Sequence, residues 1–364
     1  MEQLRIPGPT PCPDEVLQAM ARPMINHRGE EFGRILHEVT AKLKQLFLTK
    51  GDVFLLTASG TGGLEAAVVN TLSPGDKVLS VEVGVFGERF STIARQFGAE
   101  VIPISVEWGR AADVADIRRA LASEPKIKAV LVTHNETSTG MTNDLAAISS
   151  VVKEFDKLLL VDAISSLGSI ELPTDKWGCD VTVTASQKGW MVPPGLAMVS
   201  VSEKAWQAYD RAKMPRFYWD FKEAKNYLEK GQTPWTPMVS TVFALAVSLD
   251  MMLQEGLTNI IARHVRVGQA ARGGIKSLGL ALFAEEKYAS NTVTAVSTSD
   301  GLDAKKLVKV MKEEHGIVLA GGQQSLAGRI FRIGHLGWVT EDEITTVIAA
   351  LKSALPGVGF SKTK

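Results

Sequence analysis

Short apolar runs alternate with amphipathic segments between about residues 50 and 200 of this chain. The apolar runs are rich in Val, Ile and Leu and have the length of β-strands. They lie at 53–57, 77–81, 101–104, 129–133, 158–162, 181–184 and 196–201. Several segments between them have helical periodicity, at 63–71, 88–97, 114–122 and 145–155. This alternation predicts an α/β fold with a mostly parallel, doubly wound sheet that helices cover on both faces.

The pattern changes after about residue 206. A polar and aromatic connector leads to the motif at 231–237, and a long helix is predicted from residue 239 to about 253, where Gly256 ends it. From there to the end, the periodicity predicts helix, strand, helix, strand and helix. We therefore expect a large domain over residues 21–256 and a smaller C-terminal α/β domain over residues 257–364.

The N-terminal stretch follows neither pattern. Four prolines, at positions 7, 9, 11 and 13, exclude a helix or a central strand there. We expect residues 1–20 to run extended across the surface or over a cleft.

Composition narrows the class of protein. The chain has 364 residues, of which 45% are hydrophobic and 22% charged, as in an ordinary globular enzyme of two domains. Lys and Arg (40) balance Asp and Glu (40), so we expect no nucleic-acid partner and no attraction to an anionic membrane. Cys12 and Cys179 lack the spacing of a metal site, and no run is apolar enough to span a bilayer. We expect a cytoplasmic protein with reduced thiols and no metal.

Two of the predicted strands lead to residues that can do chemistry. The run at 158–162 ends in the carboxylate of Asp162, and the run at 181–184 is followed by the amine of Lys188. Neighbouring parallel strands would deliver both to one edge of the sheet. This pair suits pyridoxal phosphate (PLP), whose aldehyde forms a Schiff base with a lysine and whose ring nitrogen stays protonated beside an aspartate.

Each residue also has an ordinary structural interpretation. A lone lysine after a strand often lies along the surface with its amine in water, and an aspartate there often caps a helix or a turn. Their joint position at two strand ends favours the chemical interpretation.

A candidate phosphate anchor follows the run at 53–57. Ser59, Gly60 and Thr61 precede a predicted helix, and two further glycines follow them. Backbone N–H groups at a helix start bind phosphate, hydroxyls add donors, and glycines allow close approach. The alternatives are a plain tight turn or a dinucleotide site, although the GxGxxG spacing of dinucleotide folds is absent.

Three further features belong to the candidate site. Phe86 follows another predicted strand, where its ring could stack on a flat cofactor or belong to the core. The segment 131–140 is rich in hydroxyl and amide side chains at a strand end, which favours a polar ligand. Arg332 lies inside an apolar strand, where its guanidinium could bind a substrate carboxylate or form a structural ion pair.

In this order the motifs resemble the class V, fold-type I PLP aminotransferases, and most closely the alanine–glyoxylate and serine–glyoxylate (serine–pyruvate) group. The motifs are Ala-Ser-Gly-Thr-Gly at 58–62, Thr-His-Asn-Glu-Thr-Ser-Thr-Gly at 133–140, Ser-Gln-Lys-Gly at 186–189, Thr-Pro-Trp-Thr-Pro at 233–237 and Phe-Arg-Ile-Gly-His-Leu-Gly at 331–337. The resemblance covers nearly the whole chain. It implies a fold-type I PLP transferase with a large and a small domain.

The resemblance also implies roles for individual residues. Lys188 is the Schiff-base lysine and proton shuttle, Asp162 pairs with the ring nitrogen, and Arg332 binds the substrate carboxylate. The other implied contacts are Phe86 stacked on the ring, Ser59, Gly60 and Thr61 at the phosphate, Thr137 at the ring hydroxyl, Gln187 beside the phosphate, and Thr233 and Thr236 at the phosphate of the other subunit of a homodimer. Relatives often have Trp at the position of Phe86 and His at that of Thr61.

The implied activity is transamination of a small L-amino acid, alanine or serine, with glyoxylate or pyruvate as acceptor, through pyridoxamine phosphate. The 2-aminoethylphosphonate–pyruvate and ureidoglycine–glyoxylate transaminases stay open as alternatives, because few residues separate their substrates. A cysteine desulfurase needs a cysteine near Arg332, and no cysteine follows Cys179. A non-catalytic subunit of a larger complex would not need Lys188, Asp162 and Arg332 together.

Overall fold

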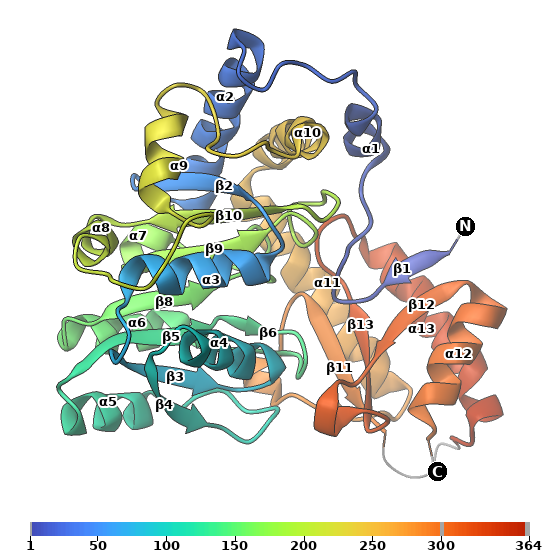
Figure 1. Ribbon diagram of the computed structural model, residues 1–364. Coiled ribbons are helices and arrows are strands. Elements are labelled where there is room, and N and C mark those ends of the chain that lie inside the picture. Colours follow the sequence, from blue (N-terminus) through green and yellow to red (C-terminus); the bar gives the residue numbers. More distant parts are fainter. Residues whose placement is uncertain (1, 299–301, 361–364) are drawn as a thin grey trace.

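A seven-stranded sheet forms the largest layer of the molecule (Figure 1). The structure is a computed structural model that describes residues 2–298 and 302–360. Residue 1 of the expected N-terminal segment, and residues 299–301 and 361–364 of the expected C-terminal domain, lie outside the described residues. The strand order is β2-β10-β9-β8-β5-β3-β4, and every neighbouring pair is parallel except the two pairs that β10 makes. The predicted mostly parallel, doubly wound sheet is therefore confirmed.

The strands lie within two residues of the predicted apolar runs. Their bounds are β2 Asp52–Thr57, β3 Lys77–Glu82, β4 Glu100–Ser105, β5 Ile127–Thr133, β8 Leu158–Asp162, β9 Val181–Ala185 and β10 Leu196–Val201. A short hairpin of β6 (Asn135–Glu136) and β7 (Met141–Thr142) follows β5.

Helices cover both faces of this sheet. Their bounds are α1 Asp14–Met20, α2 Glu30–Phe47, α3 Gly60–Thr71, α4 Val85–Gln96, α5 Val114–Ser123, α6 Leu145–Glu154, α7 Thr174–Trp177, α8 Glu203–Tyr209, α9 Phe221–Leu228 and α10 Val239–Glu255. Both α3 and α4 begin three residues before the start that the periodicity predicted. Their first turns contain glycines, which carry no amphipathic signal.

The alternation of side chains along each strand explains the two cores. In β5, Val130 and Val132 pack into one buried cluster, which includes Leu145 of α6. Leu131 points to the other face and packs with Leu64 of α3. Because both faces are covered, the strands consist of near-continuous apolar runs. Each buried Val or Leu side chain contributes about 1.5–3 kcal/mol to the free energy of folding.

A second, four-stranded sheet lies beside the first and has the order β1-β12-β13-β11. Its strands are β1 Gln3–Arg5, β11 Val293–Ser297, β12 Ile317–Gly321 and β13 Ile330–Gly334, and its helices are α11 Leu257–Ser277, α12 Ala304–His315 and α13 Glu341–Ala354. The sequence predicted one strand before the last helix, and two are present. It also missed β1, because this short strand exists only through its pairing with β12, far away in the sequence.

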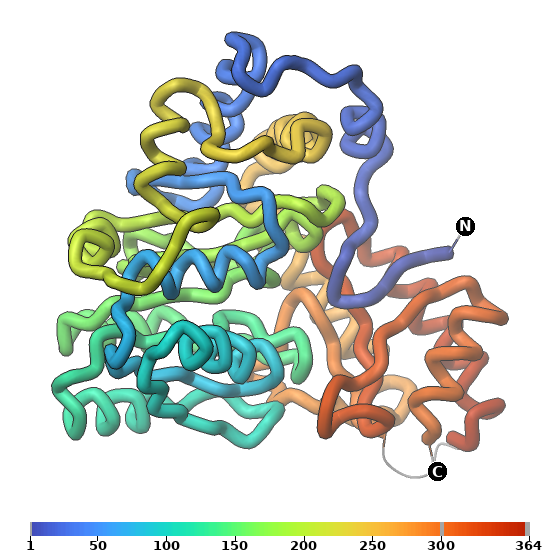
Figure 2. The backbone as a smooth tube through the Cα atoms, in the orientation of Figure 1, coloured from blue at the N-terminus to red at the C-terminus, as the bar shows by residue number. Residues whose placement is uncertain are grey.

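The N-terminal segment crosses from one sheet to the other. It leaves β1 at the four-stranded sheet, passes the edge of the seven-stranded sheet and reaches α1, which packs on α10 (Figure 2). Residues 6–10, which we call the N-terminal strap, contain no helix or strand. The expectation that all of residues 1–20 run extended is wrong for residues 14–20, which form α1 directly after the last of the four prolines. In the described part of the chain, we find no helix with both the length and the apolar character needed to cross a membrane.

Candidate active site

Asp162 and Lys188 meet at the carboxyl edge of the seven-stranded sheet. Asp162 is the last residue of β8, and Lys188 lies shortly beyond the end of β9. These strands are parallel neighbours, and Asp162 is level with Thr133 of β5 in the ladder. The side chains that follow β2, β3 and β5 reach the same edge, because these strands run in the same direction.

The carboxylate of Asp162 is buried, with 3% of the residue exposed. Its Oδ1 accepts a hydrogen bond from the backbone N–H of Ile164 at 3.0 Å. Burial raises the pKa of Asp162 to about 7, and the nearby cations Lys188 and Arg89 act in the opposite direction. A cationic group bound beside this carboxylate would favour its charged form further.

The amine of Lys188 is also withdrawn from water. Burial lowers the pKa of Lys188 to about 8, Arg332 and Arg89 lower it further, and the Asp162 carboxylate opposes them. Its Nζ donates a hydrogen bond to the carbonyl oxygen of Pro7. Near pH 8 a large fraction of such an amine is neutral, and the neutral form attacks carbonyl carbons and accepts protons.

The predicted phosphate anchor forms the start of α3. Ser59 is the N-cap residue and is exposed, and Gly60 and Thr61 occupy the first two helical positions. The N–H groups of these two positions have no hydrogen-bond acceptor within the helix. A Cβ on Gly60 would lie 2.4 Å from Cδ1 of Ile164, so this turn packs directly against the loop after Asp162. The side-chain oxygen of Gln187 is buried without a hydrogen-bond partner.

Phe86 lies in the first turn of α4, and a residue that the sequence did not single out holds that turn. The buried carboxylate of Glu136 accepts hydrogen bonds from the N–H groups of Phe86 at 2.9 Å and Gly87 at 3.1 Å. Its other oxygen accepts from the N–H and hydroxyl of Ser138. Burial raises the pKa of Glu136, and these hydrogen bonds lower it. The signal in the sequence is an acidic residue within the polar segment at 131–140.

The ring of Phe86 is half-buried. The guanidinium carbon of Arg89 lies 4.7 Å from the centroid of this ring, in a cation–π contact. Arg89 is exposed, and its charge reaches Lys188 and Asp162, because it lowers the pKa of both.

Arg332 is buried in β13, and its hydrogen bonds all go to amide or carbonyl oxygens. Nε and Nη2 donate to the carbonyl of Gly321 at 3.0 and 2.7 Å, and Nη1 donates to the carbonyl of Thr137 at 3.0 Å. Gln323 is a weaker partner at 3.4 Å. Burial lowers the pKa of Arg332 to about 10. The structural ion pair considered above is not found among the described residues, so the charge of this guanidinium is available to an anionic ligand.

Thr233 and Thr236 lie elsewhere in the chain. The hydroxyl of Thr233 donates to the carbonyl of Trp235 at 2.7 Å, and Arg28 donates to the carbonyl of Thr233 at 2.7 Å. Thr236 is exposed. Among the described residues, no hydrogen bond joins this loop to Lys188 or Asp162.

Comparisons with known proteins show the family to which the sequence is similar. The sequence pattern of the class-V aminotransferase family matches residues 4–340. The chain is 46% identical to the "soluble hydrogenase 42 kDa subunit" of Anabaena cylindrica, over 98% of this chain and 94% of the relative. It is 38% identical to the L-aspartate–glyoxylate aminotransferase of Paracoccus denitrificans (98% and 91% covered) and 35% identical to the serine–glyoxylate aminotransferase of Methylorubrum extorquens (99% and 92%).

A solved structure shows the same architecture. The alanine–glyoxylate aminotransferase of a Nostoc species superimposes with a TM-score of 0.93 at 31% identity, over 97% of this chain and 95% of that one. The predicted fold-type I architecture is thereby confirmed.

Proposed function

The chain belongs to the class-V aminotransferase family, and from this premise we propose that it transfers the amino group of a small L-amino acid, alanine or serine, to glyoxylate or pyruvate. The family makes it a PLP-dependent aminotransferase, as the motifs predicted. The substrates, the site residues and the homodimer are the proposed part. The observation that carries the proposal is the position of the buried Asp162 and the half-buried Lys188 at adjacent strand ends.

The residues at the sheet edge fit PLP. The side-chain oxygen of Gln187 is buried without a partner, and the start of α3 offers N–H groups beside the Asp162 loop. We propose that Ser59, Gly60 and Thr61 hold the phosphate, with Gln187 next to it. Phe86 would lie against the ring, and the Thr137 side chain would contact its hydroxyl. When bound, the cofactor supplies an aldehyde for the lysine and a ring that withdraws electrons from the substrate.

Lys188 and Asp162 would act on two different protons. Burial raises the pKa of Asp162 to about 7. A protonated ring nitrogen beside it would stabilise the charged carboxylate, and the carboxylate would in turn keep that nitrogen protonated. Burial lowers the pKa of Lys188 to about 8. Its amine would take a proton from the α-carbon of the amino acid and return it to the carbon on the other side of the substrate nitrogen. Arg332 would hold the substrate carboxylate, so that this proton faces the amine.

The position of Arg89 favours a second candidate for the amino donor, one with an additional acidic group. It lies close enough to Lys188 and Asp162 to lower the pKa of both, and its charge could receive a second acidic group. An aspartate or an aminoethylphosphonate donor carries such a group, and one relative is named for aspartate. No contact described above favours the ureidoglycine reaction.

The experiment is an absorbance titration of the purified protein loaded with PLP. L-serine, L-alanine, L-aspartate and aminoethylphosphonate are added separately, followed by glyoxylate or pyruvate. Loss of the yellow band with serine or alanine, restored by the oxo acid, supports the proposal. Bleaching by aspartate alone, abolished in Arg89→Ala, would replace it with the second candidate. A yellow protein that no donor bleaches would contradict both.

We further propose a cytoplasmic homodimer in which Thr236, and less directly Thr233, reaches the phosphate of the other subunit. Thr236 is exposed and follows Trp235, whose ring centroid lies 4.7 Å from that of Phe217 in a tilted contact. Phe217 is 74% exposed, so these rings form an apolar patch at the surface. Such patches commonly mark an interface. Mixing Lys188→Ala with Thr236→Val protein tests this arrangement, because a mixed dimer would contain one intact site. Activity recovered on mixing supports the shared site, and two inactive variants that stay inactive together contradict it.

A further inference from the structure

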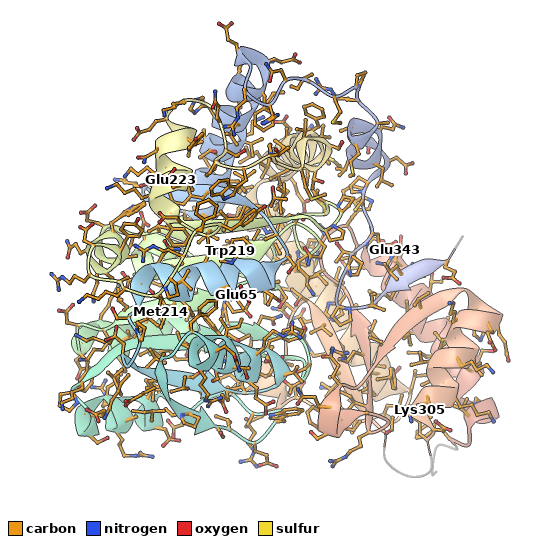
Figure 3. The ribbon with its side chains drawn as sticks, viewed as in Figure 1. Glu65, Met214, Trp219, Glu223, Lys305 and Glu343 are labelled. Carbon is orange, nitrogen blue, oxygen red and sulfur yellow. The ribbon has the colours of Figure 1, made fainter. Side chains whose placement is uncertain are left out.

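The N-terminal strap is anchored at both ends. At the four-stranded sheet, β1 pairs with β12, and the buried Arg5 forms an ion pair with Glu343 of α13, which Figure 3 labels beside β1. At the other end, the Thr10 N–H donates to the carbonyl of Gln187 at 3.1 Å, and the Thr10 hydroxyl donates to the carbonyl of Lys188 at 3.0 Å. The strap therefore connects the four-stranded sheet to the loop that carries the lysine.

Between these anchors, the strap contacts the lysine side chain itself. The carbonyl of Pro7 accepts a hydrogen bond from Nζ of Lys188. A Cβ on Gly8 would lie 2.5 Å from the same nitrogen, and Gly8 has a φ of +133°, where other residues are strained. On the opposite side, a Cβ on Gly334 of β13 would lie 2.0 Å from the carbonyl oxygen of Ile6. The strap thus has little room to shift away from the amine.

We propose that the carbonyl of Pro7 is a positioning group for the reactive amine, and that Gly8 allows it to approach. This inference rests on the proposed role of Lys188. Whenever that amine is free, it needs an acceptor that holds it at the sheet edge without reacting. A backbone carbonyl meets this need because it cannot titrate or be attacked readily, and because its place is fixed by the two anchors.

The charges around the Lys188 amine explain why its protonated form needs a hydrogen-bond acceptor. Lys188 faces one carboxylate, Asp162 at the end of β8, and two cations, Arg332 of β13 and Arg89 of α4. A hydrogen bond from the ammonium to a carbonyl stabilises the protonated form against burial and against these cations. The Pro7 carbonyl is the hydrogen-bond acceptor that the described residues offer to this amine.

The test measures the protonation of the amine itself in full-length protein freed of cofactor. Trace acetylation of Lys188 is followed by mass spectrometry across a range of pH, which gives the midpoint at which the amine becomes neutral. In Gly8→Ala, the added methyl group forces Nζ and the carbonyl apart while both anchors keep the site closed. The midpoint should move down by about one pH unit, because the ammonium has lost its acceptor.

Gly75→Ala is the matched control. Gly75 also has a positive φ, +82°, but a Cβ there would meet nothing within 4 Å, so it shares the backbone strain without the contact. Its midpoint and its activity should equal those of the wild type. A midpoint in Gly8→Ala that stays unchanged or rises would overturn the proposal, since a rise means that the strap merely shielded the amine from water.

A second variant keeps the test valid if Gly8→Ala fails to fold. A synthetic peptide of residues 1–11, joined to the rest of the chain at Cys12, can carry an ester in place of the amide between Pro7 and Gly8. The ester carbonyl is a weaker acceptor and adds no atoms to the strap. The midpoint should again fall, and an unchanged midpoint would overturn the proposal. Because no cofactor is involved, these outcomes are independent of the absorbance titration that tests the proposed function.

Discussion

The two edges of the seven-stranded sheet carry the same kinds of charged residue in opposite circumstances. At the amino edge, Lys77 pairs with Glu124 at 2.5 Å between half-buried side chains, and Lys204 pairs with the exposed Asp156 at 2.7 Å. At the carboxyl edge, Lys188, Asp162 and Arg332 are withdrawn from water, and burial alters the pKa of each. Burial without a matched partner, and not the presence of charge, separates a reactive site from an ordinary surface.

Cavity volume does not distinguish the two edges of the sheet. A hollow of about 820 Å³ lies at the amino edge, and its lining includes Lys128, Lys204 and Arg211. Lys204 there is satisfied by Asp156 and by the carbonyl of Lys157. At the carboxyl edge, in contrast, the Gln187 side-chain oxygen lacks a partner and Arg332 has only amide and carbonyl oxygens. A buried charge without an ion-pair partner, as at Arg332, therefore indicates the site better than volume does.

The largest contrast is expected between Lys188→Ala and Lys204→Ala. Without the Lys188 amine the protein loses both its attachment to the cofactor and its proton carrier, so transamination should fall by about a thousandfold or more. Lys204→Ala should leave turnover unchanged. Initial rates with the donor identified by titration measure both, and circular dichroism checks that both fold. Turnover retained in Lys188→Ala would refute the assignment.

Asp162→Asn should have the next largest effect. The amide occupies the same space but carries no charge, so the ring nitrogen loses the partner that keeps it protonated, and kcat should fall by about a hundredfold or more. Asp156→Asn at the amino edge is the control and should keep full activity. A kcat equal to that of the wild type in Asp162→Asn would exclude a role for this carboxylate.

Arg332→Ala should act on binding more than on turnover. If the guanidinium forms a buried charge pair with the substrate, its loss costs about 2–5 kcal/mol, which corresponds to a KM higher by roughly 30- to 5,000-fold. Arg118→Ala removes an exposed arginine that pairs with Glu154 and should change nothing. An unchanged KM for every carboxylate substrate in Arg332→Ala would count against this role.

The smallest expected effect concerns stability. The folded pKa of Asp162, about 7, lies above its ordinary value of 3.8, so its contribution to stability is full below about pH 4 and is lost as the pH rises through 7. Asp162→Asn avoids this loss. The cofactor-free variant should therefore melt a few degrees above the wild type at pH 8, and the difference should shrink towards pH 5. A melting temperature below that of the wild type at pH 8 would contradict this account of burial.

Local patterns in the sequence predicted the strands and the residues at their ends. Asp162 and Lys188 follow near-continuous apolar runs, and such runs fix both the strand and the edge at which its next residue lies. The same argument correctly located Arg332 in a buried strand.

Features that depend on distant pairings were missed. β1 is too short to predict without its partner β12, and Glu136 gains its role only by holding the first turn of α4. The contact of the Pro7 carbonyl with Lys188 joins residues 181 positions apart.

The most direct test of the central claim locates the cofactor on the chain. Borohydride reduces an imine between a lysine and the PLP aldehyde to a stable secondary amine, which peptide mass spectrometry can assign to one residue. The account predicts that the phosphopyridoxyl group is found on Lys188 and that Lys188→Ala protein carries none. A modification on another lysine, or an equal yield from Lys188→Ala, would contradict it.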